Sequence, residues 1–325
     1  MILNFEQVKK ITFGTERIGY YDGFFSFYRF SESQIDSYSK YKNDNLNSKT
    51  RASAGVRFSF LSDTKSLEFD CLLRPGSSRP YAYFDVYENG ALICHIGKER
   101  IDDEVLHVEC AFSGGEKHIE VYFPWSASVK ISNVSISDGA FIERKERKSS
   151  ILCFGDSITQ GYDAIYPSLS YVNNLARYID ADPVNKAVGG EIFFPELVDG
   201  SEGTMPDIVT VAYGTNDWSG CGYDAFYKNC SDFMARVNRI YFLSRVCVIA
   251  PIWRADGNDS KKIGIDNREV VDVIRRICRE YPRFKIIDGQ NLIPHLPEFF
   301  SDNVLHPNDL GFGVLSDALI KEFCR

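Results

Sequence analysis

The sequence predicts two domains of different class, an antiparallel β-sandwich over residues 1–147 and an α/β domain with a parallel sheet over residues 148–325. Three observations predict this division. Up to about residue 140, apolar residues alternate with polar ones, a period of two that is typical of half-buried strands. From residue 150 onward, apolar runs of strand length alternate with stretches of helical spacing. Between the two patterns lies a charged segment, residues 143–150, which we expect to be a solvated linker.

Alternating apolar and polar side chains mark the expected strands of the first domain. These strands cover residues 56–60, 66–72, 81–87, 118–123 and 129–136. Turn residues separate the strands, and the pair Asn89-Gly90 is typical of a tight β-hairpin because both residues tolerate a positive φ angle. Many short strands without a long helical pattern indicate two packed antiparallel sheets.

The second domain shows a different pattern, in which strands and helices alternate. Apolar runs suited to buried strands cover residues 151–154, 184–188, 208–213, 246–252 and 284–287. Apolar residues spaced by three and four positions cover residues 168–179, 224–243, 266–281 and 309–323. This order predicts a parallel sheet with helices on both faces. Sites in such sheets lie at the carboxyl ends of the strands, so polar residues after each apolar run are the candidates.

Composition argues against several classes of function. The net charge of -8 and the isoelectric point of about 5.3 argue against a nucleic acid partner, which needs a basic surface. No apolar segment approaches the length of a membrane span, and no signal peptide is recognisable. The nine cysteines form no C-x-x-C pair, so we expect reduced thiols in a cytoplasmic protein and neither disulfides nor a metal site. The oligomeric state is left open.

The most informative segment is Gly-Asp-Ser157, which follows the first apolar run of the second domain. A strand that stops at a glycine before a helix start leaves the serine hydroxyl at the carboxyl edge of the sheet. A hydroxyl there can act as a nucleophile if a base lies within hydrogen-bond reach. Gly190 and Asn216 follow the next two apolar runs, and a backbone N–H or a side-chain amide at these positions can stabilise an oxyanion. Both are also common turn residues.

A base for Ser157 must come from the two histidines of the second domain, His295 and His306. His295 lies in an apolar loop bounded by prolines, which favours a packing or surface role. His306 precedes Pro307 at the start of the last helical stretch, which places the imidazole on a stiff loop. A lone histidine before a helix cap is more often structural, so this position taken alone favours a structural role for His306.

Taken together and in this order, Gly-Asp-Ser157, the Gly190 block, Gly-Thr-Asn216-Asp and His306-Pro-Asn resemble the four sequence blocks of the SGNH (GDSL) hydrolase superfamily. The resemblance covers residues 149–325. It implies a flavodoxin-like three-layer α/β/α domain and ester hydrolysis without a metal or cofactor. It also implies that Ser157 is the nucleophile and an oxyanion donor, that Gly190 and Asn216 are further donors, and that His306 is the general base.

Two assignments within this resemblance require a choice. Gly190 is preferred to the preceding glycine because an acidic residue, Glu191, follows it, as an acidic or polar residue does in the family. The family usually carries the acid of the triad three residues before the histidine, where this chain has Asn303. Either Asp302, four residues before, reaches the imidazole through a small loop shift, or Asn303 or a backbone carbonyl orients His306 in a dyad. We place Asp302 first.

A jelly-roll-like β-sandwich joined to an SGNH domain is similar to the family 2 carbohydrate esterases, which remove acetyl groups from sugars. This second resemblance implies a carbohydrate or other small-molecule ester as substrate. Trp218, Trp253 and Arg254 follow the third and fourth apolar runs and are predicted to line its pocket, although packing between the domains explains the tryptophans equally well. The alternatives are a lipase or thioesterase for longer acyl chains, or a non-catalytic carbohydrate-binding protein, which Asn303 keeps open.

Overall fold

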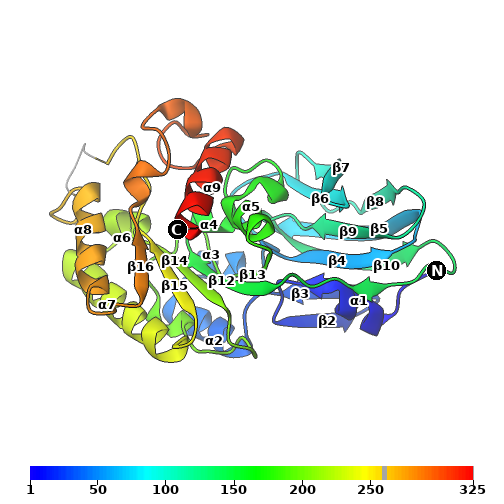
Figure 1. Ribbon diagram of the computed structural model, residues 1–325, viewed down its shortest axis with the longest axis horizontal. Helices are drawn as coiled ribbons and strands as arrows, with labels where there is room; N and C mark the ends of the chain where they lie inside the picture. Colours follow the sequence, from blue (N-terminus) through cyan, green and yellow to red (C-terminus); the bar gives the residue numbers. More distant parts are fainter. Residues whose placement is uncertain (258–261, 325) are drawn as a thin grey trace.

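Two antiparallel sheets pack face to face in the first part of the chain (Figure 1). The computed structural model describes residues 1–257 and 262–324. One sheet has the order β1-β4-β9-β6-β7, with β11 also paired to β4, and its strands are β1 (Thr12–Phe13), β4 (Arg57–Ser62), β6 (Ala82–Glu88), β7 (Ala91–Lys98), β9 (Lys117–Tyr122) and β11 (Glu143–Arg144). The other sheet has the order β2-β3-β10-β5-β8, and its strands are β2 (Arg17–Tyr21), β3 (Phe24–Tyr28), β5 (Ser66–Pro75), β8 (Leu106–Ala111) and β10 (Ala127–Ile136).

The period of two is visible in β5, whose apolar residues point into the core between the sheets. Leu67, Phe69 and Leu73 are each 1% exposed and Cys71 is 0% exposed, whereas the alternate residues Glu68, Asp70 and Leu72 are half-buried on the other face. Asn89 and Gly90 connect β6 to β7 with φ angles of +50° and +81°, as a tight hairpin turn requires. The predicted antiparallel sandwich is confirmed.

A five-stranded parallel sheet forms the second part. Its order is β13-β12-β14-β15-β16, and its strands are β12 (Ser149–Gly155), β13 (Ala181–Asn185), β14 (Ile208–Ala212), β15 (Arg245–Ile249) and β16 (Phe284–Ile287). This is the flavodoxin-like order 2-1-3-4-5, in which the direction of chain progression reverses beside the first strand. The reversal separates the loops after β12 and β14 and opens a crevice at their carboxyl ends. The predicted α/β class is therefore confirmed, and the strand order places Ser157 and Asn216 at neighbouring strand ends.

Helices cover both faces of the parallel sheet (Figure 1). In β12, Leu152 and Phe154 pack toward α7 and α8, while Ile151 and Cys153 pack toward α5 and α9. This two-sided burial explains why the strand reads as a continuous apolar run. The helices of this part are α4 (Ser157–Gln160), α5 (Tyr171–Tyr178), α6 (Thr215–Gly220), α7 (Tyr223–Ile240), α8 (Asn267–Cys278) and α9 (Asp309–Phe323), with short 3₁₀ turns η1 (Pro167–Leu169), η2 (Pro195–Leu197), η3 (Gly289–Asn291) and η4 (Pro297–Phe299).

Three helices in the first part were not expected from its strand pattern: α1 (Phe5–Ile11), α2 (Glu32–Tyr41) and α3 (Asp44–Lys49). Each is too short to show a clear helical period. Ser31 nevertheless begins α2 with a capping box to Gln34, a signal that is visible in the sequence. Tyr38 of α2 is fully buried in the core beside the parallel sheet. The α2–α3 segment therefore packs on the second domain, although it lies within residues 1–147.

The expectation of a solvated linker at residues 143–150 holds only in part, because Glu143, Lys145, Glu146 and Lys148 are exposed but the rest of the segment is packed. Residues Glu143–Arg144 form β11, and Arg147 is mostly buried. The Arg147 guanidinium donates to Glu120 at 2.7 Å, to the Tyr122 hydroxyl at 2.9 Å and to the Ala181 carbonyl at 3.1 Å. A charged side chain can be buried here because it finds a carboxylate and other oxygen acceptors on both domains. The junction is thus a packed part of the interface.

Candidate active site

Ser157 is the first residue of α4, directly after β12. Gly155 ends the strand, and a Cβ atom there would lie 2.1 Å from Thr159 Oγ1, so only glycine fits. Asp156 caps α4, because its carboxylate accepts the N–H of Ile158 at 3.0 Å. This turn leaves the Ser157 hydroxyl at the carboxyl edge of the sheet, as the sequence predicts, with the residue only 5% exposed.

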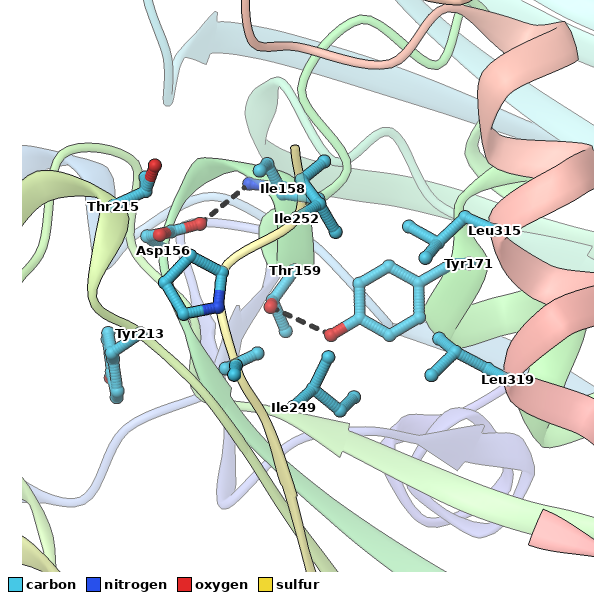
Figure 2. Close-up of a pocket in the computed structure, with 13 residues that line it drawn as sticks. Asp156, Ile158, Thr159, Tyr171, Tyr213, Thr215, Ile249, Ile252, Leu315 and Leu319 are labelled. Carbon is cyan, nitrogen blue, oxygen red and sulfur yellow. Dashed lines mark hydrogen bonds between the residues drawn. The ribbon is translucent and has the colours of Figure 1, made fainter. Parts of the chain in front are cut away.

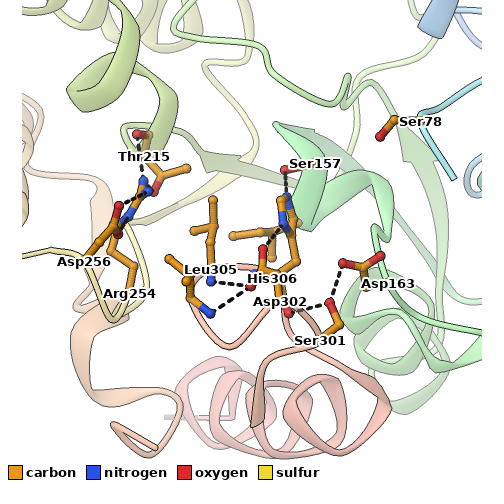
Figure 3. Close-up of polar contacts among 12 residues, drawn as sticks. Ser78, Ser157, Asp163, Thr215, Arg254, Asp256, Ser301, Asp302, Leu305 and His306 are labelled. Carbon is orange, nitrogen blue, oxygen red and sulfur yellow. Dashed lines mark hydrogen bonds and ion pairs between the residues drawn. The ribbon is translucent and has the colours of Figure 1, made fainter. Parts of the chain in front are cut away.

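A chain of two hydrogen bonds joins Ser157 to His306 and Asp302 (Figure 3). His306 Nε2 lies 2.9 Å from Ser157 Oγ, and its Nδ1 lies 2.8 Å from Asp302 Oδ2. The other oxygen of Asp302 accepts the backbone N–H groups of residues 304–306 at 2.7–3.1 Å. Asn303 is exposed and adopts φ +58°, a left-handed conformation that asparagine tolerates. This tight turn lets the residue four positions before the histidine reach the imidazole.

The hydrogen bonds around Asp302 keep its carboxylate ionised. Partial burial alone would raise the pKa of Asp302, but the hydrogen bonds from His306 and from three backbone N–H groups outweigh it and hold the pKa well below its usual range. An ionised carboxylate can only accept, so Nδ1 of the imidazole carries the hydrogen. Nε2 is then left with a lone pair that faces Ser157, which is the arrangement a general base needs.

The predicted oxyanion donors lie after β13 and β14 and are held by hydrogen bonds. The Gly189 N–H donates to Gln160 Oε1 at 2.7 Å, so this amide is already used. Gly190 is exposed and adopts φ +91°. The Asn216 side-chain amide donates to the Glu191 carbonyl at 2.9 Å, which leaves its second hydrogen for a ligand. Gly190 therefore stays the predicted backbone donor, and Asn216 the predicted side-chain donor.

One side chain of the first domain, Arg79, is linked to the loop that carries His306, a contact that the sequence did not reveal. Arg79, in the loop between β5 and β6, donates to both oxygens of Asp163, with the Nη2 bond at 2.8 Å. Ser301 also donates to Asp163, and its N–H donates to the His306 carbonyl at 2.8 Å. The Tyr162 ring stacks on the imidazole at 5.7 Å between ring centroids. Figure 3 shows the bond between Ser301 and Asp163, and Arg79 extends this support for the loop of the base to the first domain.

The substrate-pocket prediction is wrong for Trp218 and Arg254. Trp218 is 0% exposed, and its indole N–H donates to the Ile265 carbonyl at 2.9 Å, so it belongs to the core. Arg254 is 7% exposed, and its guanidinium is bound by Asp256 and by Thr215 Oγ1 (Figure 3). Both residues follow apolar runs as expected, but their side chains turn into the protein, which a linear pattern does not determine.

Trp253 is half-buried and lies apart from Trp218 in the second domain. Its ring stacks on His295 with 5.0 Å between centroids and an interplanar angle of 10°, and it contacts Phe300. His295 also bonds the Gln290 carbonyl at 2.6 Å. The packing or surface role expected for His295 agrees with these contacts and with its exposure, and a substrate contact for Trp253 stays a prediction.

A small cavity lies beneath Asp156, between the sheet and α9 (Figure 2). Its lining includes Ile158, Tyr171 and Leu315, and its volume is about 30 Å³. This is room for about one water molecule. The cavity is therefore part of the core behind the nucleophile and is too small for a substrate.

Asp217, the buried residue after Asn216, predicts a pH-dependent stability. Its Oδ1 accepts the Phe193 N–H at 3.2 Å, and burial raises its pKa to about 7 from the ordinary value of 3.8. The folded state therefore holds this proton more tightly than the unfolded chain, so the free energy of unfolding falls as pH rises from about 4 to about 7. We expect Asp217→Asn, which keeps the acceptor oxygen but does not titrate, to reduce this fall in urea unfolding experiments.

The exposed residue Asp317 offers a matched control for this measurement. Asp317→Asn should leave the slope of unfolding free energy against pH unchanged. Identical slopes for wild type and Asp217→Asn would show that Asp217 does not retain its proton in the folded protein.

Over residues 1–257 and 262–324 there is no group of three or more His, Cys, Asp or Glu side chains placed to hold a metal ion. In the same part of the chain, every helix is too short or too polar to cross a membrane.

The sequence matches one protein family over the domain that carries these residues. Residues 153–314 fit the GDSL-like Lipase/Acylhydrolase family. This domain belongs to that family. Its members are acylhydrolases, and the matched span contains Ser157, Gly190, Asn216 and His306. No curated protein matches the chain.

Solved structures share the whole two-domain architecture of this GDSL-like protein. A salicylyl-acyltransferase from a tetracycline biosynthetic pathway is 18% identical with a TM-score of 0.80, a GDSL-like lipase of Bacteroides ovatus is 17% identical with 0.70, and a family two carbohydrate esterase of Cellvibrio japonicus is 16% identical with 0.67. Each comparison covers 96% of this chain and 93% of the other. At these identities the likeness establishes the fold alone.

Proposed function

We propose that this protein is a serine esterase that removes small acyl groups, O-acetyl groups foremost, from carbohydrates. The hydrogen-bonded chain Ser157–His306–Asp302 at the sheet edge carries the proposal. The family match supports acyl chemistry, and the carbohydrate esterases of the same two-domain fold support a sugar as the alcohol. The charge, burial and spacing of the three side chains are those that acyl transfer by serine needs.

In the acylation half, Ser157 Oγ attacks the ester carbonyl carbon while His306 Nε2 takes its proton. Asp302 stabilises the imidazolium that forms. The carbonyl oxygen becomes an oxyanion, which accepts hydrogen bonds from the backbone N–H groups of Ser157 and Gly190 and from the Asn216 amide. The tetrahedral intermediate then collapses, the ester C–O bond breaks, and His306 gives its proton to the departing sugar oxygen.

In the deacylation half, water takes the place of the sugar hydroxyl. His306 removes a proton from this water, whose oxygen attacks the acyl carbon on Ser157. The second oxyanion uses the same donors. When it collapses, the carboxylic acid leaves and Ser157 Oγ recovers the proton from His306, which returns the site to its starting state.

Asn216 should contribute through the oxyanion alone. We expect Asn216→Ala to lower kcat for acetyl esters by roughly 10²–10³ with little change in KM, because the missing donor acts on the transition state. Steady-state kinetics check this, with Asn45→Ala, an exposed asparagine on α3, as the control that should behave like wild type. A normal kcat in Asn216→Ala would count heavily against this oxyanion hole.

The proposed function is tested by measuring hydrolysis of esters that differ in the length of the acyl chain and in the alcohol. We expect kcat/KM to fall from p-nitrophenyl acetate to butyrate to octanoate, and expect acetate release from O-acetylated xylo- or cello-oligosaccharides measured by an enzyme-coupled assay. Highest rates on octanoate would indicate a lipase or thioesterase instead. Sugar binding without turnover, unaffected by Ser157→Ala, would indicate a binding protein, and acyl release only to an added alcohol would indicate a transferase.

A further inference from the structure

The α2–α3 segment of the first domain reaches the loop that carries Gly190. Leu46 and Lys49, both on α3, lie closest to the space above Gly190, where a Cβ would meet Leu46 Cδ2 at 3.6 Å and Lys49 Nζ at 3.8 Å. The Lys49 ammonium donates to the Gly189 carbonyl at 2.8 Å. Helix α3 therefore touches the peptide that links Gly189 to Gly190.

The Lys49 ammonium binds the carbonyl oxygen of the same peptide group whose N–H is the predicted oxyanion donor. All peptide bonds of the described residues are trans, so the Gly189 C=O and the Gly190 N–H point in opposite directions from one peptide plane. A cation bound at the carbonyl oxygen fixes the orientation of this plane. It also draws electron density toward that oxygen, which makes the N–H at the other end a stronger donor.

We propose that Lys49, supplied by the first domain, is a positioning residue of the oxyanion hole: it holds and polarises the Gly189–Gly190 peptide so that the Gly190 N–H faces the developing oxyanion. The inference rests on the proposed acyl-transfer function. Its charge adds a favourable field at the oxyanion as well. Within the described residues Lys49 forms no ion pair, and the nearby Glu191 carboxylate, which also acts on the Lys49 charge, is paired with Lys42.

A buried arginine connects the backbone of Lys49 to the backbone of the strand that leads to Gly190. Arg29 is fully buried, and its guanidinium donates to the carbonyls of Lys49 at 3.4 Å, Asn185 at 2.5 Å and Ala187 at 3.1 Å. One side chain thus ties the end of α3 to the end of β13, where the loop to Gly190 begins. Burial also lowers the pKa of Lys49, which agrees with an ammonium group placed away from open water.

A second lysine of the same segment supports the other donor. Lys42, which ends α2, pairs with the buried carboxylate of Glu191 at 2.7 Å. The Glu191 carbonyl accepts the Asn216 amide at 2.9 Å. The α2–α3 segment is therefore linked to both Gly190 and Asn216, and this explains why it packs on the second domain rather than on the sandwich.

The test uses the full chain with Lys49→Met, which keeps the aliphatic stem and removes the charge. We expect kcat for p-nitrophenyl acetate, per active site titrated by the burst of nitrophenol, to fall roughly ten- to a hundredfold with KM within about twofold. Lys49→Arg should recover part of the loss, because a guanidinium can also donate to the carbonyl. Lys40→Met, an exposed lysine on α2, should match wild type.

A second readout does not depend on ester turnover. Diethyl p-nitrophenyl phosphate phosphorylates an activated serine and places negative charge in the oxyanion hole, and mass spectrometry follows its attachment to Ser157. Slower labelling of Lys49→Met than of wild type, at equal melting temperature, supports the inference. This holds even if wild type hydrolyses no ester, a result that would contradict only the proposed function. Equal labelling rates, or an equal kcat per titrated site, overturn the role of Lys49.

Discussion

Ser157→Ala is expected to lower kcat for acetyl esters by about 10⁴- to 10⁶-fold, the largest effect of any single change in this protein. The alanine removes the atom that attacks the carbonyl carbon, so no acyl-enzyme can form. The oxyanion donors remain, and residual rates of about 10³–10⁴ over the reaction in water are the most they supply. The Ser157 hydroxyl bonds to His306 at the edge of the sheet, so its loss should leave the fold intact.

The measurement for Ser157→Ala is kcat with p-nitrophenyl acetate together with a thermal melt. Ser48→Ala, on the exposed side of α3, should keep wild-type kinetics. Mass spectrometry during turnover should find an added acyl group in wild type and none in Ser157→Ala. Retained turnover in Ser157→Ala with an unchanged melting temperature would mean that another residue or a water performs the attack.

Asp302→Asn is expected to lower kcat by about 10⁴-fold while the geometry of the loop is kept. An asparagine oxygen can still accept the N–H groups of residues 304–306, which leaves its NH₂ group facing His306 Nδ1. Nδ1 must then accept, so the ring hydrogen moves to Nε2. An imidazole that presents N–H to Ser157 Oγ cannot take its proton, and the general base is lost.

Asn303 supplies the matched control for this loop. Asn303→Gly keeps a residue that tolerates φ +58° but has no side chain, so we expect kcat within about twofold of wild type. The comparison separates the alternatives left by the sequence. A large loss in Asn303→Gly, with Asp302→Asn within tenfold of wild type, would assign the orientation of the imidazole to Asn303.

The activities of wild type and of both variants should be measured as a function of pH. The pKa of Asp302 lies well below its usual range. Its carboxylate therefore stays ionised in the folded protein at neutral and mildly acidic pH. Loss of wild-type activity on acidification therefore reports protonation of another group. The slow activity that remains in Asp302→Asn should rise with pH as hydroxide replaces the missing base.

Local pattern was enough to predict the class of each domain, and the resemblance of the four ordered blocks to the SGNH superfamily predicted the site residues. Strand β5 alternates with period two and β12 is continuously apolar, because one has a single buried face and the other has two. Ser157 could be predicted because a strand, a glycine and a helix start are adjacent in the chain. The short helices α2 and α3 were not predicted, because six to ten residues are too few to show a helical period clearly.

Contacts between residues far apart in the chain could not be predicted in this way. Trp218 and Arg254 follow the expected strands, yet the direction of their side chains depends on what packs around them. Arg79 meets Asp163 across 84 positions, and Lys49 meets Gly189 across 140. No periodicity in the sequence connects such pairs. Taken alone, Arg79, Asp163 and Lys49 are typical of ordinary charged surface residues.

The sequence by itself therefore determined the class of each domain, because this depends on spacing along single strands and helices, and the resemblance of its four blocks to the SGNH superfamily supplied the candidates for nucleophile and base. Only the tertiary structure decided that Asp302 and not Asn303 faces the imidazole, since a left-handed turn at one residue selects which side chain points inward. It also decided that the first domain lies against the loops of Gly190 and His306. Those contacts arise when two separately patterned domains bury their shared surface, which is a property of the packed molecule and not of any segment.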